Sequence, residues 1–135
     1  MRFMVMVMAT NESEAGPPPK PEAFVAMQKY NEELAKAGIL LAAEGLTPSS
    51  QGVRVQFSGE ERTVTDGPFA ETKELVAGFT IIKVKSKEEA IELVKRAPIV
   101  SPNGKAVVEI RKLMDLEDFG DGFMPNEEIA KVKFK

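Results

Sequence analysis

Apolar and polar positions alternate along this chain with two different periods. Residues 3–8 are a continuous apolar run, which is typical of a central β-strand buried on both faces. From Val53 to Phe57, apolar residues alternate with Arg54 and Gln56, as expected for a strand with one exposed face. A turn at residues 58–61 joins that strand to the next as a hairpin. The predicted strands cover residues 2–8, 39–46, 53–57, 62–66, 76–84 and 107–113.

Two segments carry the helical period instead. The first begins at Pro21, a residue suited to the first helical position, and ends near Ala37, with Gly38 placed to adopt a left-handed conformation. The second follows Ser86 and Glu89, which have the spacing of a capping box, and stops before Pro98. Residues 9–20 contain three consecutive prolines, and we expect a loop there.

This order of elements predicts an α+β fold of the ferredoxin-like kind: βαβ, a hairpin and βαβ, giving an antiparallel sheet with both helices on one face. If Val108 and Ile110 face the helices, Glu109 and Arg111 line the open face. The strand at 76–84 is apolar on both faces, so the open face also carries apolar side chains. Because a large exposed apolar patch is unfavourable in water, we expect a homodimer with sheet against sheet.

The amino-acid composition limits the catalytic groups and the partners that this chain can have. The 135 residues include no cysteine and no histidine, which removes thiolate nucleophiles, disulfides and the most common general base near neutral pH. The net charge is −3 with no long basic run, which argues against a nucleic-acid partner. The apolar start is too short to cross a bilayer. We therefore predict a cytoplasmic protein with no cofactor and no membrane partner.

The most distinctive segment runs from Asp66 to Glu74 and reads Asp-Gly-Pro-Phe-Ala-Glu-Thr-Lys-Glu, followed by Val-Ala-Gly-Phe at residues 76–79. It resembles the DGPF signature of the YCII-related family. The resemblance extends over residues 1–119, which we take as the domain, with residues 120–135 as a C-terminal extension. It rests also on the methionine-rich first strand, Glu44-Gly45-Leu46, Glu89-Ala90, Ala97-Pro98 and Glu109-Ile110-Arg111.

The resemblance implies a dimeric α+β barrel. Genes of DGPF-type members often lie beside those of extracytoplasmic-function sigma factors, which implies a regulatory or stress context. Some relatives in the wider group resemble lyases with a His–Asp pair as the acid–base centre. Asp66 stands where that aspartate is expected, but this sequence has no histidine, so the pair cannot be carried over.

Asp66 is our candidate catalytic residue, because a carboxylate beside an apolar dimer cleft can act as a base. Gly67 and Pro68 have a competing structural explanation as turn residues, and Phe69 as a core plug. The charged residues near the motif and on the open face have a competing explanation as solvated or ion-paired surface groups. Nothing in the spacing of the acidic residues requires a metal. The candidate ligand-binding residues are Glu44, Phe69, Glu71, Lys73, Glu109 and Arg111.

Two functions remain open at this point. The first is a small acid–base enzyme, an isomerase or lyase, acting on a small metabolite in the dimer cleft with Asp66 moving the proton. The second is a non-catalytic module that binds a small ligand or regulates a sigma-factor system, which the absence of histidine favours.

Overall fold

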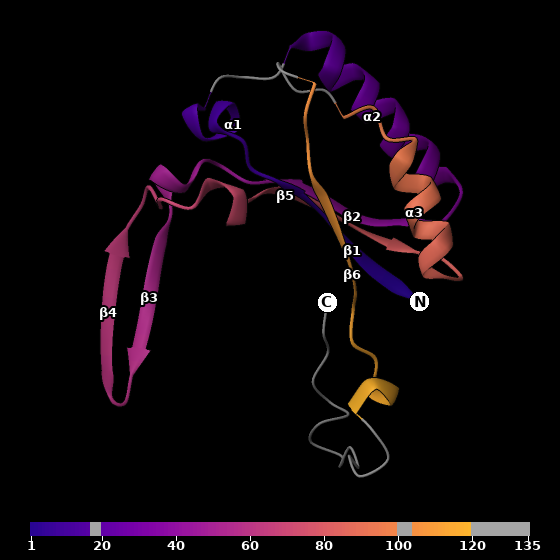
Figure 1. The fold of residues 1–135 in the computed structure, drawn as a ribbon. Helices are drawn as coiled ribbons and strands as arrows, with labels where there is room; N and C mark the ends of the chain where they lie inside the picture. The colour runs from indigo at the N-terminus through magenta and orange to yellow at the C-terminus, as the bar shows by residue number, and fades with distance from the viewer. Residues whose placement is uncertain (17–19, 100–103, 120–135) are drawn as a thin grey trace.

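A four-stranded antiparallel sheet with two helices on one face forms the body of the molecule (Figure 1). The computed structural model describes residues 1–16, 20–99 and 104–119. The strands are β1 (Arg2–Met8), β2 (Leu40–Gly45), β3 (Val53–Ser58), β4 (Glu61–Asp66), β5 (Val76–Lys83) and β6 (Val108–Lys112). The helices are α1 (Asn11–Ala15), α2 (Pro21–Lys36) and α3 (Lys87–Lys95), with short 3₁₀ turns η1 (Ser49–Gln51), η2 (Thr72–Glu74) and η3 (Leu116–Phe119).

The order of strands in the sheet is β2-β5-β1-β6, and every neighbouring pair is antiparallel. Strands β3 and β4 form a separate two-stranded hairpin. The predicted α+β fold with a ferredoxin-like order of elements is therefore confirmed. Strand β1 lies in the centre because its residues are apolar on both faces, which suits a position flanked by β5 and β6.

The core lies between the sheet and the two long helices. Phe3 and Val5 of β1 pack with Ile82 of β5, Leu34 of α2 and Leu93 of α3. Tyr30 of α2 ties the helices together, since its hydroxyl donates a hydrogen bond to the Leu93 carbonyl over 2.7 Å. Burial raises the pKa of that phenol, because the charged form would lose its hydration.

Most helix boundaries follow the sequence signals. Gly38 has a φ of 75° after the end of α2, as predicted. The hydroxyl of Ser86 accepts a hydrogen bond from the Glu89 amide over 3.1 Å, but the Glu89 carboxylate accepts from the Lys85 amide and not from that of Ser86. The reciprocal half of the expected capping box is thus displaced by one residue.

One expectation is wrong. Residues 11–15 form the short helix α1 where we expected only loop. The side chains of Thr10 and Ser13 exchange hydrogen bonds with each other's backbone amide, so a complete capping box starts this helix. The prolines that argued for a loop follow the helix and lie outside the described residues. The short element expected from Asn126 also lies outside them.

The open face of the sheet has the composition expected from the alternation along each strand. The register places Met6 of β1 between Phe79 of β5 and Glu109 of β6, with Glu44 of β2 beyond Phe79. The next row contains Ala42, Ile81, Met4 and Arg111. An apolar centre is therefore bordered by charged side chains on the two edge strands.

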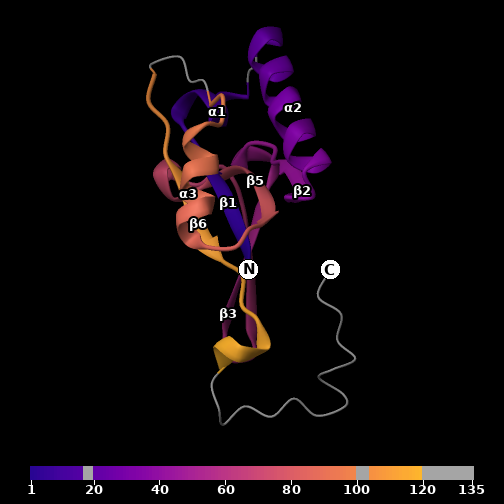
Figure 2. The ribbon, with the colours of Figure 1, turned by 90° about the vertical axis from the view of Figure 1, so that its right-hand side faces the viewer.

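The hairpin extends past the sheet on the side away from α2 and α3, in both views (Figures 1 and 2). All twelve of its strand residues are exposed. Among the described elements, β3 and β4 make their extensive contacts only with each other. The hairpin is thus an arm joined to the body at its base, where the motif begins.

Candidate functional site

The loop that carries the motif is fixed against the 3₁₀ turn η1. Gly67 follows β4, and its amide donates a hydrogen bond to the Gly52 carbonyl over 2.9 Å. A Cβ atom at Gly67 would lie 1.7 Å from the Ser49 carbonyl oxygen, so no other residue fits without moving the backbone. Two residues on, the Phe69 amide donates to the Ser49 hydroxyl over 3.1 Å. The structural explanation therefore applies to Gly67.

Ser49 is itself held by Glu14 of α1. The Glu14 carboxylate accepts a hydrogen bond from the Ser49 amide over 2.9 Å and makes a second, short one with the Ser49 hydroxyl. Both bonds favour the ionised acid, and they lower the pKa of Glu14 below its ordinary value. A continuous chain of hydrogen bonds thus runs from α1 through η1 to the motif.

The ring of Phe69 stacks against an arginine of the hairpin. The guanidinium carbon of Arg54 is 3.8 Å from the centre of the Phe69 ring, a cation–π contact. The ring is half-buried and Arg54 is exposed, so the pair stands at the base of the hairpin and not in the core. The explanation of Phe69 as a core plug does not describe this position.

An open hollow of about 500 Å³ lies beside this pair. It is lined by Phe69, by Arg54, Gln56 and Thr65 from the polar face of the hairpin, and by Val55. Hydroxyl, amide and guanidinium groups therefore meet one aromatic ring in a single concavity. Such a combination fits a small ligand with an apolar ring and polar substituents.

The stacked guanidinium keeps its capacity to bind an anion. An arginine contacts an aromatic ring through its flat face, whereas its N–H groups point outward in the plane. In the part of the chain that the structure describes, Arg54 makes no hydrogen bond and no ion pair. Its donors are available for a carboxylate or a similar planar anion, which guanidinium groups bind in a bidentate manner.

Asp66 is the last residue of β4 and the first residue of the motif. It pairs with Val53 across the hairpin and is exposed. Because side chains alternate along a strand, Asp66 points to the face opposite Thr65 and therefore away from the wall of the hollow. Within residues 1–16, 20–99 and 104–119, its carboxylate has no hydrogen-bond partner, so it is not committed to a structural role.

The other predicted ligand-binding residues do not gather at the hollow. Glu44 and Glu109 stand in one row of the open face but on opposite edges, roughly 14 Å apart at the usual spacing of three strands. Arg111 lies 3.9 Å from Glu109 in an exposed ion pair, which contributes little to stability. Glu71 and Lys73 lie at η2 and are exposed, and no ion pair joins them in the described ranges.

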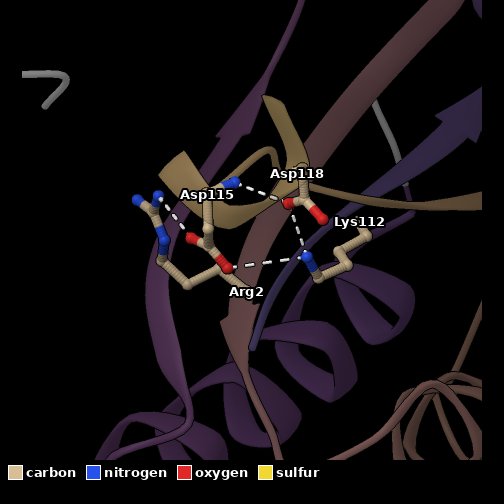
Figure 3. Close-up of polar contacts among 4 residues, drawn as sticks. All are labelled: Arg2, Lys112, Asp115 and Asp118. Carbon is tan, nitrogen blue, oxygen red and sulfur yellow. Dashed lines mark hydrogen bonds and ion pairs between the residues drawn. The ribbon is translucent and has the colours of Figure 1, made fainter. Parts of the chain in front are cut away.

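A denser charged cluster lies at the far end of β6 (Figure 3). The Lys112 ammonium lies 2.6 Å from Asp118 and 3.5 Å from Asp115, and Arg2 lies 3.7 Å from Asp115. The hydrogen bond from the Asp115 amide and the Lys112 ammonium lower the pKa of Asp118, and the Asp118 carboxylate raises the pKa of Lys112. These four charges pair with one another, so the cluster links η3 to β6 and β1.

Among the described residues, no group of three or more acidic side chains is arranged to hold a metal ion. The same residues include no helix long and apolar enough to cross a membrane.

Sequence reasoning missed most of the hollow and its support. Arg54 and Gln56 were recognised only as the polar half of a strand, and Thr65 had no signal at all. Glu14 and Ser49 were missed because the segments that contain them look like loops. The sequence does contain a signal that Arg54 and Phe69 lie close together. Arg54 stands near the start of the first hairpin strand and Phe69 shortly after the end of the second, and a hairpin brings these two ends side by side.

Comparisons of the sequence with known proteins relate this chain to one family. The model of the YCII-related domain family matches residues 1–116. An uncharacterised protein of Rhizobium meliloti (strain 1021) is 35% identical over 68 residues, which is 50% of this chain and 55% of that protein, so the match spans little more than half of the relative.

One solved structure similar to this chain is a 5-chloro-2-hydroxyhydroquinone dehydrochlorinase from Burkholderia phenoliruptrix AC1100, in complex with 2,5-dihydroxybenzoquinone. It is 14% identical with a TM-score of 0.49, and the alignment covers 87% of this chain and 98% of the other.

Proposed function

The chain belongs to the YCII-related domain family, and from that premise we propose that it binds a small planar anion in the hollow between the hairpin and Phe69. The observation that carries this proposal is the stacking of Arg54 on the motif phenylalanine at 3.8 Å. The ring offers an apolar surface to a flat ligand, and the guanidinium offers two parallel donors to its carboxylate. Gln56 and Thr65 supply neutral hydrogen bonds that select among ligands.

The exposed carboxylate of Asp66 favours an enzymatic version of this function. It ends the strand that supplies Thr65 and has no hydrogen-bond partner in the described part of the chain. Because Asp66 points to the hairpin face opposite the hollow, this version needs a ligand on that other face, in a cleft closed by a second copy, where Asp66 can accept or deliver a proton in an isomerisation or elimination. The open-face residues Glu44, Glu109 and Arg111 would then border the same cleft.

The absence of histidine favours a second candidate, a module that binds the same ligand without turning it over. Such a module is compatible with a regulatory role beside a sigma factor. The module needs only the hollow beside Arg54 and Phe69, whereas the enzyme also needs the hairpin face that carries Asp66.

Binding is tested by calorimetric titration with benzoate, the simplest planar aromatic anion. Arg54→Met removes the guanidinium and is expected to weaken benzoate binding at least tenfold. Arg62→Met is the matched control, since Arg62 stacks on Phe57 at 4.4 Å on the opposite face of the same hairpin. Equal benzoate affinity in wild type and Arg54→Met contradicts the proposal.

Catalysis is tested on whichever planar carboxylates bind from a panel of enol and aromatic acids. In deuterated water, an acid–base enzyme exchanges a carbon-bound proton of its ligand, which proton NMR detects as a lost signal. Asp66→Asn is expected to abolish the exchange while binding persists. Binding without exchange in the wild-type protein supports the non-catalytic module instead.

A further inference from the structure

The segment that forms the hollow is joined to the rest of the molecule at very few points. It covers residues 47–69 and contains η1, the hairpin and Phe69. None of its residues is buried, so apolar packing does little to fix it against the body. Among the described residues, Ser49 alone makes hydrogen bonds from this segment to a residue outside it, and the partner is Glu14 of α1. The ion pairs of the described residues include none from this segment.

The Ser49 hydroxyl connects Glu14 with Phe69. A hydroxyl has one hydrogen to donate and two lone pairs with which to accept. Ser49 donates its hydroxyl hydrogen to the Glu14 carboxylate, and the same oxygen accepts from the Phe69 amide over 3.1 Å. The Ser49 amide donates to the second oxygen of that carboxylate over 2.9 Å. Because hydrogen bonds to an ionised acceptor are the stronger ones, Glu14 sets the direction in which Ser49 presents its lone pairs.

The placement of the Phe69 ring depends on this connection. Within the described part of the chain, the bond to Ser49 is the one hydrogen bond that Phe69 makes. The ring in turn carries the stacked guanidinium of Arg54, and both side chains line the hollow, whereas Glu14 does not. Binding sites require such side chains to be held within fractions of an ångström by hydrogen bonds from behind. A displacement of Phe69 therefore alters the ring surface and the guanidinium donors together.

We propose that Glu14 is a positioning residue of the ligand hollow, which acts through Ser49 to hold Phe69 where its ring stacks with Arg54. This inference rests on the proposed function and deepens it, because it assigns control of the hollow to a helix that does not line it. The hydroxyl bond from Ser49, and after it the amide bond, hold the pKa of Glu14 below its ordinary value, so the carboxylate is ionised at neutral pH. In the described ranges no ion pair reaches Glu14, and its charge serves Ser49.

Glu14→Gln separates positioning from simple electrostatics, because the two predict opposite signs. Removing a negative charge near an anion site lowers repulsion and by itself strengthens benzoate binding. Glutamine has one oxygen in place of the two that accept the Ser49 bonds, so benzoate binding at neutral pH is expected to weaken at least threefold. Glu12→Gln is the matched control, since Glu12 lies in the same turn of α1 and makes no hydrogen bond among the described residues. Benzoate binding by Glu14→Gln as tight as by wild type, or tighter, overturns the proposal.

Proton NMR of the ligand-free protein locates the ring itself. Protons that lie over an aromatic ring resonate upfield, so the side-chain protons of Arg54 report how closely Phe69 stacks. Phe69→Leu removes the ring and supplies the unshifted reference. The upfield shift is expected to fall by at least half in Glu14→Gln and to keep its wild-type value in Glu12→Gln. A lower stability alone does not move this shift in a folded protein, and an unchanged shift in Glu14→Gln overturns the positioning role.

Ser49→Ala tests the same connection without altering α1. It keeps the Glu14 charge, so weaker benzoate binding and a smaller Arg54 shift in this variant have no Coulombic explanation, with Ser50→Ala as control. Wild-type values of both in Ser49→Ala overturn the proposal. The outcomes are separable from those of the proposed function. If the wild type does not bind benzoate, the proposed function fails and the Arg54 shift decides the role of Glu14. If wild type and Glu14→Gln bind benzoate equally, the ligand site stands and the positioning role fails.

Discussion

Gly67→Ala is the substitution that most directly tests how the motif is held in place. The added Cβ would lie 1.7 Å from the Ser49 carbonyl oxygen, whereas real Cβ contacts are essentially never below 3.0 Å. The two atoms must therefore separate by more than about 1 Å, and both belong to ordered backbone. That movement also breaks the 2.9 Å hydrogen bond from the Gly67 amide to Gly52.

The energetic consequence follows from the cost of overpacking. Forcing extra volume into a packed region costs typically about 1–3 kcal/mol, and the upper end applies here because the clash is with backbone. For a chain of this size, about 3 kcal/mol corresponds to a melting temperature lower by roughly 10 °C. Displacement of the loop also moves Phe69 away from Arg54, so benzoate affinity is expected to fall together with stability.

Thermal unfolding followed by circular dichroism checks the first expectation, and calorimetric titration with benzoate checks the second. Gly45→Ala is the matched control, because a Cβ there meets nothing within 4 Å. If Gly67→Ala has the same melting temperature as the wild type, glycine at this position is not required for close packing against η1.

Two further substitutions test neighbouring features. Ser49→Ala removes the hydroxyl, the larger of the two causes that lower the pKa of Glu14, and keeps the Ser49 amide, so NMR titration is expected to show this pKa moving part of the way back toward 4.5, with Ser50→Ala as the unaffected control. The lowered pKa of Glu14 stabilises the folded protein only at pH values above the pKa of this group in the unfolded chain. The difference in unfolding free energy between wild type and Ser49→Ala is therefore largest above about pH 4.5. The gap closes as the pH falls through the folded pKa; a gap that widens in acid would contradict this. Asn31→Leu is expected to raise the free energy of unfolding by about 1 kcal/mol in urea denaturation, because the Asn31 Oδ1 atom has no partner among the described residues and lines an apolar cavity of about 50 Å³. Destabilisation equal to that of Asn31→Ala would show that Asn31 makes a needed polar contact.

Local signals in the sequence predicted the elements and their order well. The apolar run of β1, the alternation in β3 and the helix signals at Pro21 and Gly38 act over a few residues, and each element was confirmed at the position expected. The buried face that the alternation predicted for β3 is wrong, because all six residues of that strand are exposed. The α1 helix was missed because its capping pair, Thr10 and Ser13, lies beside a proline cluster that dominated the interpretation.

The composition of the open face was also accessible from the sequence. Strand alternation alone places Glu109 and Arg111 opposite Val108 and Ile110, and the register agrees. What alternation cannot give is the distance between edges, which depends on the order of strands. Only the order β2-β5-β1-β6 separates Glu44 from Glu109 by the full width of the sheet.

The sequence by itself determined the fold class, the strands and the identity of the motif, because backbone propensities and side-chain periodicity are properties of neighbouring residues. Only the tertiary structure decided that Arg54 stacks on Phe69 and that Ser49 excludes any side chain at Gly67. Those contacts join segments about 15 to 20 residues apart through a hairpin base and a 3₁₀ turn. Their geometry follows from how the chain closes in space, which no local pattern records.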